Sequence, residues 1–347
     1  MARNLGQKRK ADHLRIALGE KSQIGNPGFD NYKFIHNALP EIDFDEIDTS
    51  TTFLGKKVDY PFFISCMTGG VQKGQKLNEN LAKAAQKYNI TMGVGSQRIA
   101  IENPEYEKLF STREFAPDAP LLANVGIVQL NYGFGPPEFQ RCVDMIKADA
   151  LSVHLNPIQE IIQPEGDKNW SGLLTKLEKV VKKLSVPVIA KEVGFGLSED
   201  VVRQLYDIGV RHFDTAGWGG TNWSYVEGAR GKADKSLGNL FSSWGIPTTE
   251  SIKMCKEFKN SKTTAQKLKI TILGSGGVRD GIDIAKSIAL GADVVGIATP
   301  FGQAGLRSSG AVGKLIEKLA LEFKTTMFGV GAKNLKDLQL VKLTKTN

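Results

Sequence analysis

The chain has 347 residues, of which 41% are hydrophobic and 24% are charged, and these proportions are typical of a globular protein with a large core. They exclude a disordered, collagen-like or fibrous chain. The 45 Lys and Arg residues exceed the 37 Asp and Glu residues and give a net charge of +8. This modest excess does not select a partner, because solvated lysines explain it as well as an anionic ligand does.

The cysteines and the apolar runs bear on the cellular compartment. Cys66, Cys142 and Cys255 lie far apart and show neither a paired framework nor the spacing of a zinc site, which favours a reducing compartment. Residues 1–20 are polar and basic, and no run of 18 apolar residues occurs. We therefore expect a cytoplasmic protein that does not enter a membrane.

Eight short apolar runs recur along the chain, and helix-like stretches lie between them. The runs are residues 60–67, 90–95, 121–126, 150–156, 187–193, 212–217, 269–273 and 292–298. Buried parallel strands read as continuous apolar runs, so this pattern predicts an α/β fold, a closed (β/α)₈ TIM barrel, with an open doubly wound sheet as the alternative. Apolar residues at helical spacing predict outer helices over 76–88, 173–184, 199–208 and 281–290, and a last helix near 314–327.

Three segments do not fit the repeating unit. We expect residues 1–58 to form an N-terminal extension with a basic arm, residues 59–330 to form the barrel, and residues 331–347 to form a basic C-terminal tail. The longest interval between strands follows the sixth one, and its residues 218–267 hold three of the four tryptophans. A barrel loop of this length is typical of a lid or an oligomer contact.

The strongest single motif runs from Ser275 to Arg279 and opens a helix, and Gly296 to Pro300 follow about one β/α unit later. Glycine lets the backbone approach an anion closely, and a helix amino end adds partial positive charge. Many barrels bind phosphate after their seventh and eighth strands in this way, and the phosphate of FMN suits such a site. The alternative is a simple tight turn before a helix.

Polar side chains also end the third and fifth strands. Lys191 interrupts the apolar run 187–193, and a buried lysine needs an anionic neighbour, which a reduced flavin supplies. The alternative partner is Glu192 or another carboxylate at the barrel mouth. Asn124 can both donate and accept against the edge of a flavin ring, although a strand-end cap explains it too.

After the fourth strand come His154, Asn156, Gln159 and Glu160. Glu160 is a candidate Mg²⁺ ligand, because Mg²⁺ binds through one or two carboxylates plus substrate phosphates. His154 suits a site residue and a hydrogen-bonded structural residue equally well.

Basic residues near the amino terminus form a second candidate anion site. Arg9 and Lys10 have the default interpretation of a solvated arm. The more specific interpretation is a clamp for a diphosphate, for which the planar fork of arginine is suited, and Arg98 offers a second clamp.

Taken in order, these motifs resemble the type 2 isopentenyl-diphosphate isomerase family in its archaeal style. The resemblance covers nearly the whole chain, and its segments are Arg9-Lys10-x-Asp12-His13, Met67-Thr68-Gly69-Gly70, Val94-Gly95-Ser96-Gln97-Arg98, His154-Leu155-Asn156-Pro157-x-Gln159-Glu160, Lys191-Glu192, Gly219-Gly220-Thr221-Asn222-Trp223 and Ser275-Gly276-Gly277-x-Arg279.

The resemblance implies a cytoplasmic isomerase of isoprene biosynthesis that interconverts isopentenyl and dimethylallyl diphosphate. It implies FMN in its reduced form, NADPH as reductant, Mg²⁺ on the diphosphate, and a homotetramer or homo-octamer that binds neither nucleic acid nor membrane. An unactivated alkene is a very weak base and the candidate residues include no evident acid and base pair of carboxylates, so we expect the reduced FMN to act as acid and base. By similarity, FMN would contact Met67, Thr68, Gly69, Ser96, Asn124, Lys191, Thr221, Ser275, Gly276, Gly277, Ala298 and Thr299. The substrate would contact Arg9, Lys10, Ser96, Gln97, Arg98, His154, Asn156 and Gln159, with Gln159 as the catalytic residue that positions the alkene and Glu160 on the metal.

Two positions depart from the family, and two other functions compete with it. Ala216 stands where the family usually has Ser, so it is not assigned to the site, and Trp218 replaces a smaller or polar residue and is expected to crowd the lid. A 2-hydroxy acid oxidase, another FMN barrel, needs a histidine base near the sixth and seventh strands, and none follows His212. A nucleic-acid-binding protein would need a recognisable module, which the sequence lacks.

Overall fold

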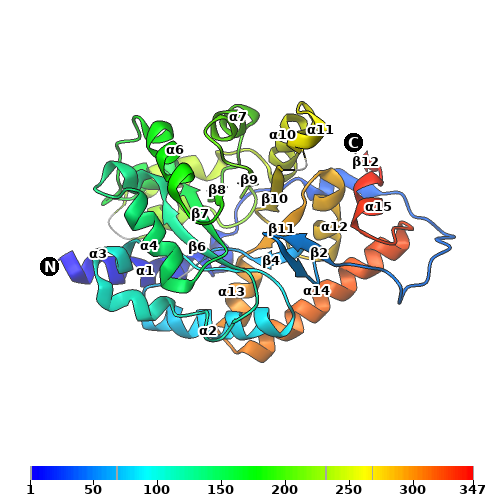
Figure 1. Cartoon of the computed structure of the whole chain (residues 1–347), viewed down its shortest axis with the longest axis horizontal. Helices are drawn as coiled ribbons and strands as arrows, with labels where there is room; N and C mark the ends of the chain where they lie inside the picture. Colours follow the sequence, from blue (N-terminus) through cyan, green and yellow to red (C-terminus); the bar gives the residue numbers. More distant parts are fainter. Residues whose placement is uncertain (1, 68, 231–232, 268, 347) are drawn as a thin grey trace.

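The computed structural model describes residues 2–67, 69–230, 233–267 and 269–346, with side chains from residue 9 onward. Eight parallel strands close into a barrel, with helices around it (Figure 1). The strands are β4 (Phe62–Ile64), β5 (Met92–Gly93), β6 (Leu121–Gly126), β7 (Ala150–Leu155), β8 (Val188–Glu192), β9 (His212–Asp214), β10 (Thr271–Ser275) and β11 (Val294–Ile297). Each lies within or overlaps a predicted run, so the TIM barrel is confirmed and the open sheet is wrong.

The strand register decides which side chains meet at the mouth of the barrel. On adjacent strands His154 is paired with Lys191, and Lys191 is paired with Asp214. Because all strands are parallel, their carboxyl ends share one rim. The three side chains therefore come from one level of the barrel.

The ring around the barrel contains the helices that the sequence predicts. The helices of the β/α units are α2 (Gln72–Lys87), α4 (Pro136–Ile146), α6 (Leu173–Lys183), α7 (Glu199–Asp207), α10 (Thr248–Asn260), α12 (Gly281–Leu290) and α14 (Ser309–Gly329). Shorter helices are α3 (Arg98–Glu102), α5 (Pro157–Ile162), α8 (Trp223–Gly228), α9 (Lys235–Leu240), α11 (Thr264–Lys267), α13 (Thr299–Gly305) and α15 (Leu335–Leu340). Short 3₁₀ segments are η1 (Glu20–Ser22), η2 (Phe29–Asn31), η3 (Pro104–Phe110), η4 (Ile127–Asn131) and η5 (Phe241–Ser243). No helix within the described residues is long and apolar enough to cross a membrane.

The predicted insertion at 218–267 is only partly an insertion. Helix α10 packs on β10 and buries Ile252, Cys255 and Phe258 completely. It is therefore the ring helix that joins β9 to β10. The additional segment is the part before it, which carries α8, α9 and η5. The residues of α10 were predicted as part of the insertion because the interval between the sixth and seventh strands is long.

A hairpin closes the end of the barrel opposite the mouth. Strands β2 (Thr51–Phe53) and β3 (Lys56–Val58) pair antiparallel through a two-residue turn in which Leu54 and Gly55 have φ of 52° and 76°. Phe53 and Val58 join one buried cluster with barrel residues such as Phe63 and Leu122. The hairpin thus blocks this end, and ligand access is left to the other.

The C-terminal segment pairs with the N-terminal extension. Strand β1 (Tyr32–Phe34) pairs antiparallel with β12 (Leu343–Lys345), and Leu338 of α15 is fully buried. Residues 331–346, predicted as a basic tail, are therefore folded against the N-terminal extension.

Candidate active site

A cavity of about 220 Å³ opens at the carboxyl ends of the barrel strands. Nearly all predicted site residues line it: Arg9, Lys10, Met67, Gly69, Ser96, Arg98, Asn124, His154, Asn156, Gln159, Glu160, Lys191, Thr221, Ser275, Gly276, Gly277, Ala298 and Thr299. Thr68 lies outside the described residues, and Gln97 does not belong to the lining. The fold therefore gathers residues from seven separate motifs around one space.

The basic arm lies over the mouth of its own barrel. It is helix α1 (Ala2–Ala17), and the ammonium group of Lys10 donates to the carbonyl oxygens of Gly69 at 3.0 Å and Ser96 at 2.6 Å. Burial, together with the nearby charge of Arg9, lowers the pKa of Lys10 to about 7. The interpretation as a solvated arm is therefore wrong, because the arm is docked on the strand ends.

The turn after β10 is built for close approach of a ligand. Gly276 and Gly277 have φ of 111° and 71°, and a Cβ on Gly276 would lie 2.3 Å from the carbonyl oxygen of Gly217. A Cβ on either residue would collide with the backbone of Gly217 or Gly219, so only glycine fits in this turn, and the backbone of the two glycines lines the cavity as a cradle. A phosphate group fits such a cradle. The turn therefore has the features that a phosphate site requires.

Lys191 has a protein partner as well as a place in the cavity wall. Its Nζ lies 3.0 Å from Oδ2 of Asp214, and Asp214 accepts a short hydrogen bond from the hydroxyl of Ser275. Glu192 is occupied differently, since it accepts the backbone N–H groups of Val193, Gly194 and Phe195. The predicted alternative of a carboxylate partner is thus correct, but the partner is Asp214.

Asn124 and His154 contact each other across neighbouring strands. Oδ1 of Asn124 lies 3.0 Å from Nδ1 of His154. Burial and the charge of Lys191 lower the pKa of His154 to about 3, so the imidazole is neutral at physiological pH. It can therefore take part in hydrogen bonds without adding charge.

The structure does not support a substrate contact for Gln97. Its side chain is completely buried beneath the cavity, where it accepts from the N–H of Asn124 at 2.8 Å and donates to the carbonyl oxygen of Cys142 at 2.9 Å. Both ends of the amide are thus used by the backbone. Gln97 holds the strand that carries Asn124.

The residues after β7 form one hydrogen-bonded cluster on α5. Asn156 donates to Gln159 at 3.1 Å and to Glu160 at 2.9 Å, while its own Oδ1 is buried and has no partner among the described residues. Burial raises the pKa of Glu160. The described residues contain no group of three or more His, Cys, Asp or Glu that could hold a metal. A divalent cation at Glu160 would therefore take most of its ligands from substrate and water, which suits Mg²⁺.

Comparison with known proteins decides the family. The sequence pattern of a family described as FMN-dependent dehydrogenase matches residues 19–104 and 248–345. The chain is 48% identical over 337 residues to the isopentenyl-diphosphate delta-isomerase of Nostoc sp. and covers 94% of it, with 96% of this chain aligned. The protein of the same name from Rickettsia africae is 47% identical over 340 residues, which are 96% of each chain. The chain belongs to the isopentenyl-diphosphate delta-isomerase family.

Solved structures show how this isomerase shares its barrel with enzymes of other activities. A lactate oxidase from Pediococcus acidilactici aligns with a TM-score of 0.66 at 16% identity over 95% of this chain and 87% of its own. A flavocytochrome b2 variant with benzoylformate aligns with a TM-score of 0.67 at 18% identity over 93% of this chain and 78% of its own. At these identities the likeness shows the fold alone. Among the described cavity residues the histidines are His13 and His154, so the base that an oxidase would need after β9 is absent there.

Sequence reasoning missed Glu227, which the isomerase buries completely behind the cavity wall. Its carboxylate accepts from Gln159 at 2.8 Å, lies 2.8 Å from Nε2 of His13, and pairs with Arg230 at 2.5 Å. Burial acts to raise the pKa of Glu227, but the contacts with His13, Gln159 and Arg230 outweigh it and hold the pKa at about 2. The one feature of the sequence that points to Glu227 is that it is a carboxylate in the helix that follows the Gly219 to Trp223 motif.

The two departures from the family pattern have different outcomes. Ala216 lines the cavity with φ of 35°, so it belongs to the wall although it brings no hydroxyl. Trp218 is not part of the cavity lining. Its indole packs on Gly25, where a Cβ would lie 2.4 Å from the ring, and its N–H donates to the carbonyl oxygen of Ser242. Trp218 thus lies outside the cavity, where it packs between the N-terminal extension and the insertion.

Proposed function

We propose that this isomerase interconverts isopentenyl diphosphate and dimethylallyl diphosphate in isoprenoid biosynthesis, with reduced FMN and Mg²⁺. The observation that carries the proposal is a single cavity lined by two groups of residues that are suited to anions. One group is the glycine cradle of Gly276 and Gly277, and the other is the basic group of Arg9, Lys10 and Arg98. A flavin phosphate and a diphosphate substrate each need one such group. The names of relatives that align over nearly the full chain agree with this pairing.

The residues that line the cavity are suited in kind to hold FMN. The cradle with Ala298 and Thr299 would hold the phosphate, and the remaining contacts would come from Met67, Thr68, Gly69, Ser96, Asn124, Lys191 and Thr221. When bound in its reduced form, the flavin supplies a proton donor and acceptor for the alkene, which ordinary side chains protonate poorly at neutral pH. Lys191 would tune the charge of the flavin, and its pairing with Asp214 fixes where that positive charge lies.

The diphosphate would be held at a distance from the reacting carbons. Arg9, Lys10 and Arg98 would bind its oxygens, Mg²⁺ at Glu160 would neutralise it further, and Ser96, His154 and Asn156 would complete the surroundings. Binding energy from this remote group fixes the alkene, so a small hydrocarbon without polar handles can still be oriented. The imidazole of His154 is neutral and donates from Nδ1 to Oδ1 of Asn124, so its Nε2 can only accept a hydrogen bond here.

Gln159 would position the alkene. Its amide is oriented from both ends, because its oxygen accepts from Asn156 at 3.1 Å and its nitrogen donates to Glu227 at 2.8 Å. Such a fixed side chain restricts the substrate without exchanging a proton itself. We further propose, from the family resemblance, NADPH as reductant and a cytoplasmic homotetramer or homo-octamer.

The test uses purified protein with FMN, Mg²⁺ and isopentenyl diphosphate. Anaerobic samples reduced with dithionite are compared with samples oxidised in air, and dimethylallyl diphosphate is followed over time. We expect product only in the reduced samples, its loss when Mg²⁺ is chelated, and reduction of the flavin by NADPH. Absence of product in both states, with FMN bound, would reject the isomerase activity and keep the flavin site.

A further inference from the structure

The loop after α5 folds tightly onto the candidate metal ligand. At Gly166 a Cβ would lie 1.8 Å from the carbonyl oxygen of Glu160, so only glycine fits. This close approach brings the N–H of Asp167 to 2.7 Å from Oε2 of Glu160. The indole N–H of Trp170 donates to the carbonyl oxygen of Asp167 at 3.1 Å and fastens the loop from the other side. The backbone of Asp167 thus orients Glu160.

The carboxylate of the same residue orients a different group. Oδ2 of Asp167 accepts from Nη1 of Arg98 at 2.5 Å and from Nε2 of Gln129 at 3.2 Å, and the side chain is only 12% exposed. Arg98, Gln129 and Glu160 line the cavity, whereas Asp167 does not. Asp167 therefore reaches the cavity only through its neighbours.

Arg98 is held so that part of its guanidinium stays available. Nε donates to Glu102 at 2.7 Å and Nη1 donates to Asp167, while Nη2 has no partner in the part of the chain that the structure describes. Glu102 lies on the same helix, four residues on, and its side chain is 42% exposed. Asp167 comes from a distant loop and is the more buried of the two anchors.

We propose that Asp167 is a positioning residue that locks the diphosphate clamp Arg98 and the metal ligand Glu160 into one relative geometry. The side chain of Asp167 fixes the orientation of Arg98, and its backbone N–H fixes the orientation of Glu160. The two groups that would bind the diphosphate follow different strands but are thus held by the same residue. This inference rests on the proposed function for the diphosphate, although not on turnover.

An argument from charge alone predicts the opposite change in diphosphate affinity, so the direction of the change distinguishes the two explanations. Removing a carboxylate close to an anion site lowers repulsion and would tighten binding of a diphosphate. Loss of the fixed orientation of Arg98 would instead weaken diphosphate binding. A charge-assisted hydrogen bond is roughly twice as strong as a neutral one, so without the aspartate Arg98 would sample other rotamers. The Asp167→Asn variant keeps the shape of the side chain and the backbone N–H, so it separates these two effects.

The experiment measures binding of inorganic pyrophosphate to the FMN-loaded protein in Mg²⁺ by calorimetry. Asp167→Asn should weaken binding roughly tenfold, which corresponds to about 1.4 kcal/mol. Glu102→Gln is the matched control, since it removes an equal charge from the same guanidinium without touching the loop at Glu160, and it should change binding less than twofold. In a double-mutant cycle, adding Asp167→Asn to Arg98→Ala should cause little further loss, because the aspartate acts through the arginine.

The outcomes separate this inference from the proposed function. Unchanged or tighter binding in Asp167→Asn, or additive losses in the cycle, would overturn the inference, with melting temperature and flavin absorbance confirming that the variants are folded. A wild-type protein that binds pyrophosphate but forms no dimethylallyl diphosphate would reject the proposed function and leave this result in place. If the wild type bound no pyrophosphate, both would fall. In turnover assays the same variant should raise KM and largely spare kcat.

Discussion

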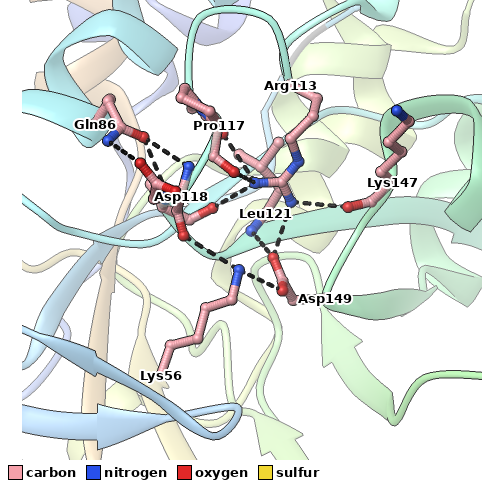
Figure 2. A network of polar contacts seen from close by, with 10 residues as sticks. Lys56, Gln86, Arg113, Pro117, Asp118, Leu121, Lys147 and Asp149 are labelled. Atoms are coloured by element: carbon pink, nitrogen blue, oxygen red, sulfur yellow. Dashed lines mark hydrogen bonds and ion pairs between the residues drawn. The ribbon is translucent and has the colours of Figure 1, made fainter.

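The two ends of the barrel each hold an arginine, and the two guanidinium groups differ in how many of their nitrogens have a partner. At the closed end, Arg113 donates from Nη1 to the carbonyl oxygens of Ala116, Pro117 and Ala119. Its Nη2 donates to the carbonyl oxygen of Lys147 and to the carboxylate of Asp149, as Figure 2 shows. Both terminal nitrogens are fully used, and each contact is with the same chain. At the mouth, Arg98 uses two of its nitrogens and leaves the third without a partner among the described residues.

The carboxylates and amides follow the same division. Asp149 at the closed end accepts from Arg113, from Lys56 and from the N–H of Leu121, which ties the loops before β6 and β7 together (Figure 2). At the mouth, buried amide oxygens of Gln129 and Asn156 have no partner in the described chain. A satisfied network stabilises, whereas unsatisfied buried polar atoms cost free energy unless a ligand meets them. The closed end therefore serves stability and the mouth serves binding, as barrels generally divide them.

The largest expected effect is on stability at the closed end. Arg113→Ala removes one of the three donors of Asp149 and the donor of four carbonyl groups, and we expect the loss of these contacts together to cost about 3 kcal/mol. Urea unfolding should show this loss, while FMN affinity at the far end stays unchanged. A loss of less than about 1 kcal/mol would show that water replaces the guanidinium and that the two ends are less different than their contacts suggest.

At the mouth, a substitution in the glycine cradle of Gly276 and Gly277 should lower FMN affinity more than it lowers the stability of the fold. Gly276→Ala would place a methyl group 2.3 Å from the carbonyl oxygen of Gly217, and we expect FMN affinity to fall roughly 100-fold because the backbone must shift where the phosphate lies. Fluorescence titration with FMN measures it. Gly133→Ala is the matched control, because Gly133 also has a positive φ, of 88°, but has nothing within 4 Å of a Cβ. Equal FMN affinity in both variants would argue against the cradle.

The sequence predicted the parts of the molecule that depend on local pattern. Continuous apolar runs identify the eight strands, and Ser275 to Gly277 identifies the phosphate turn, because both signals lie within a few neighbouring residues. Contacts between distant segments were not predictable. Asp214 meets Ser275 and Lys191 only through strand register, and Asp167 meets Arg98 only through a folded loop. Gln97 turns away from a cavity that both of its chain neighbours, Ser96 and Arg98, line.

Gln159→Asn tests whether the oriented amide contributes to the reaction rather than to cofactor binding. Shortening the side chain by one methylene withdraws its amide from Glu227, and we expect kcat to fall about 30-fold, within the range that misplacement of a positioned group produces. FMN affinity should be retained. Gln140→Asn, on the exposed face of α4, is the control for the same substitution and should leave kcat unchanged. Loss of FMN in Gln159→Asn would sink the assignment.

The smallest expected effect is a pH dependence that belongs to the mouth alone. Lys10 has a pKa of about 7 in the free protein because burial and Arg9 disfavour its charge, and a bound diphosphate would raise that pKa. The contribution of Lys10 to pyrophosphate affinity is therefore complete below pH 7 and declines above it, by about fivefold between pH 7 and 8. Calorimetry across this range measures it, and the ratio to Lys10→Arg, which stays charged, removes the titration of pyrophosphate itself.

Folding stability should respond to Lys10 with the opposite sign, which separates the two roles of this residue. Its pKa is lowered in the folded protein from an ordinary value of 10.5, so the unfolded chain binds the proton more tightly between about pH 7 and 10.5. Stability from Lys10 then rises with pH over this window while its contribution to anion affinity falls. If wild type and Lys10→Arg gave the same pH profile for pyrophosphate, Lys10 would serve only to fasten α1 to Gly69 and Ser96, and the mouth would resemble the closed end at this position.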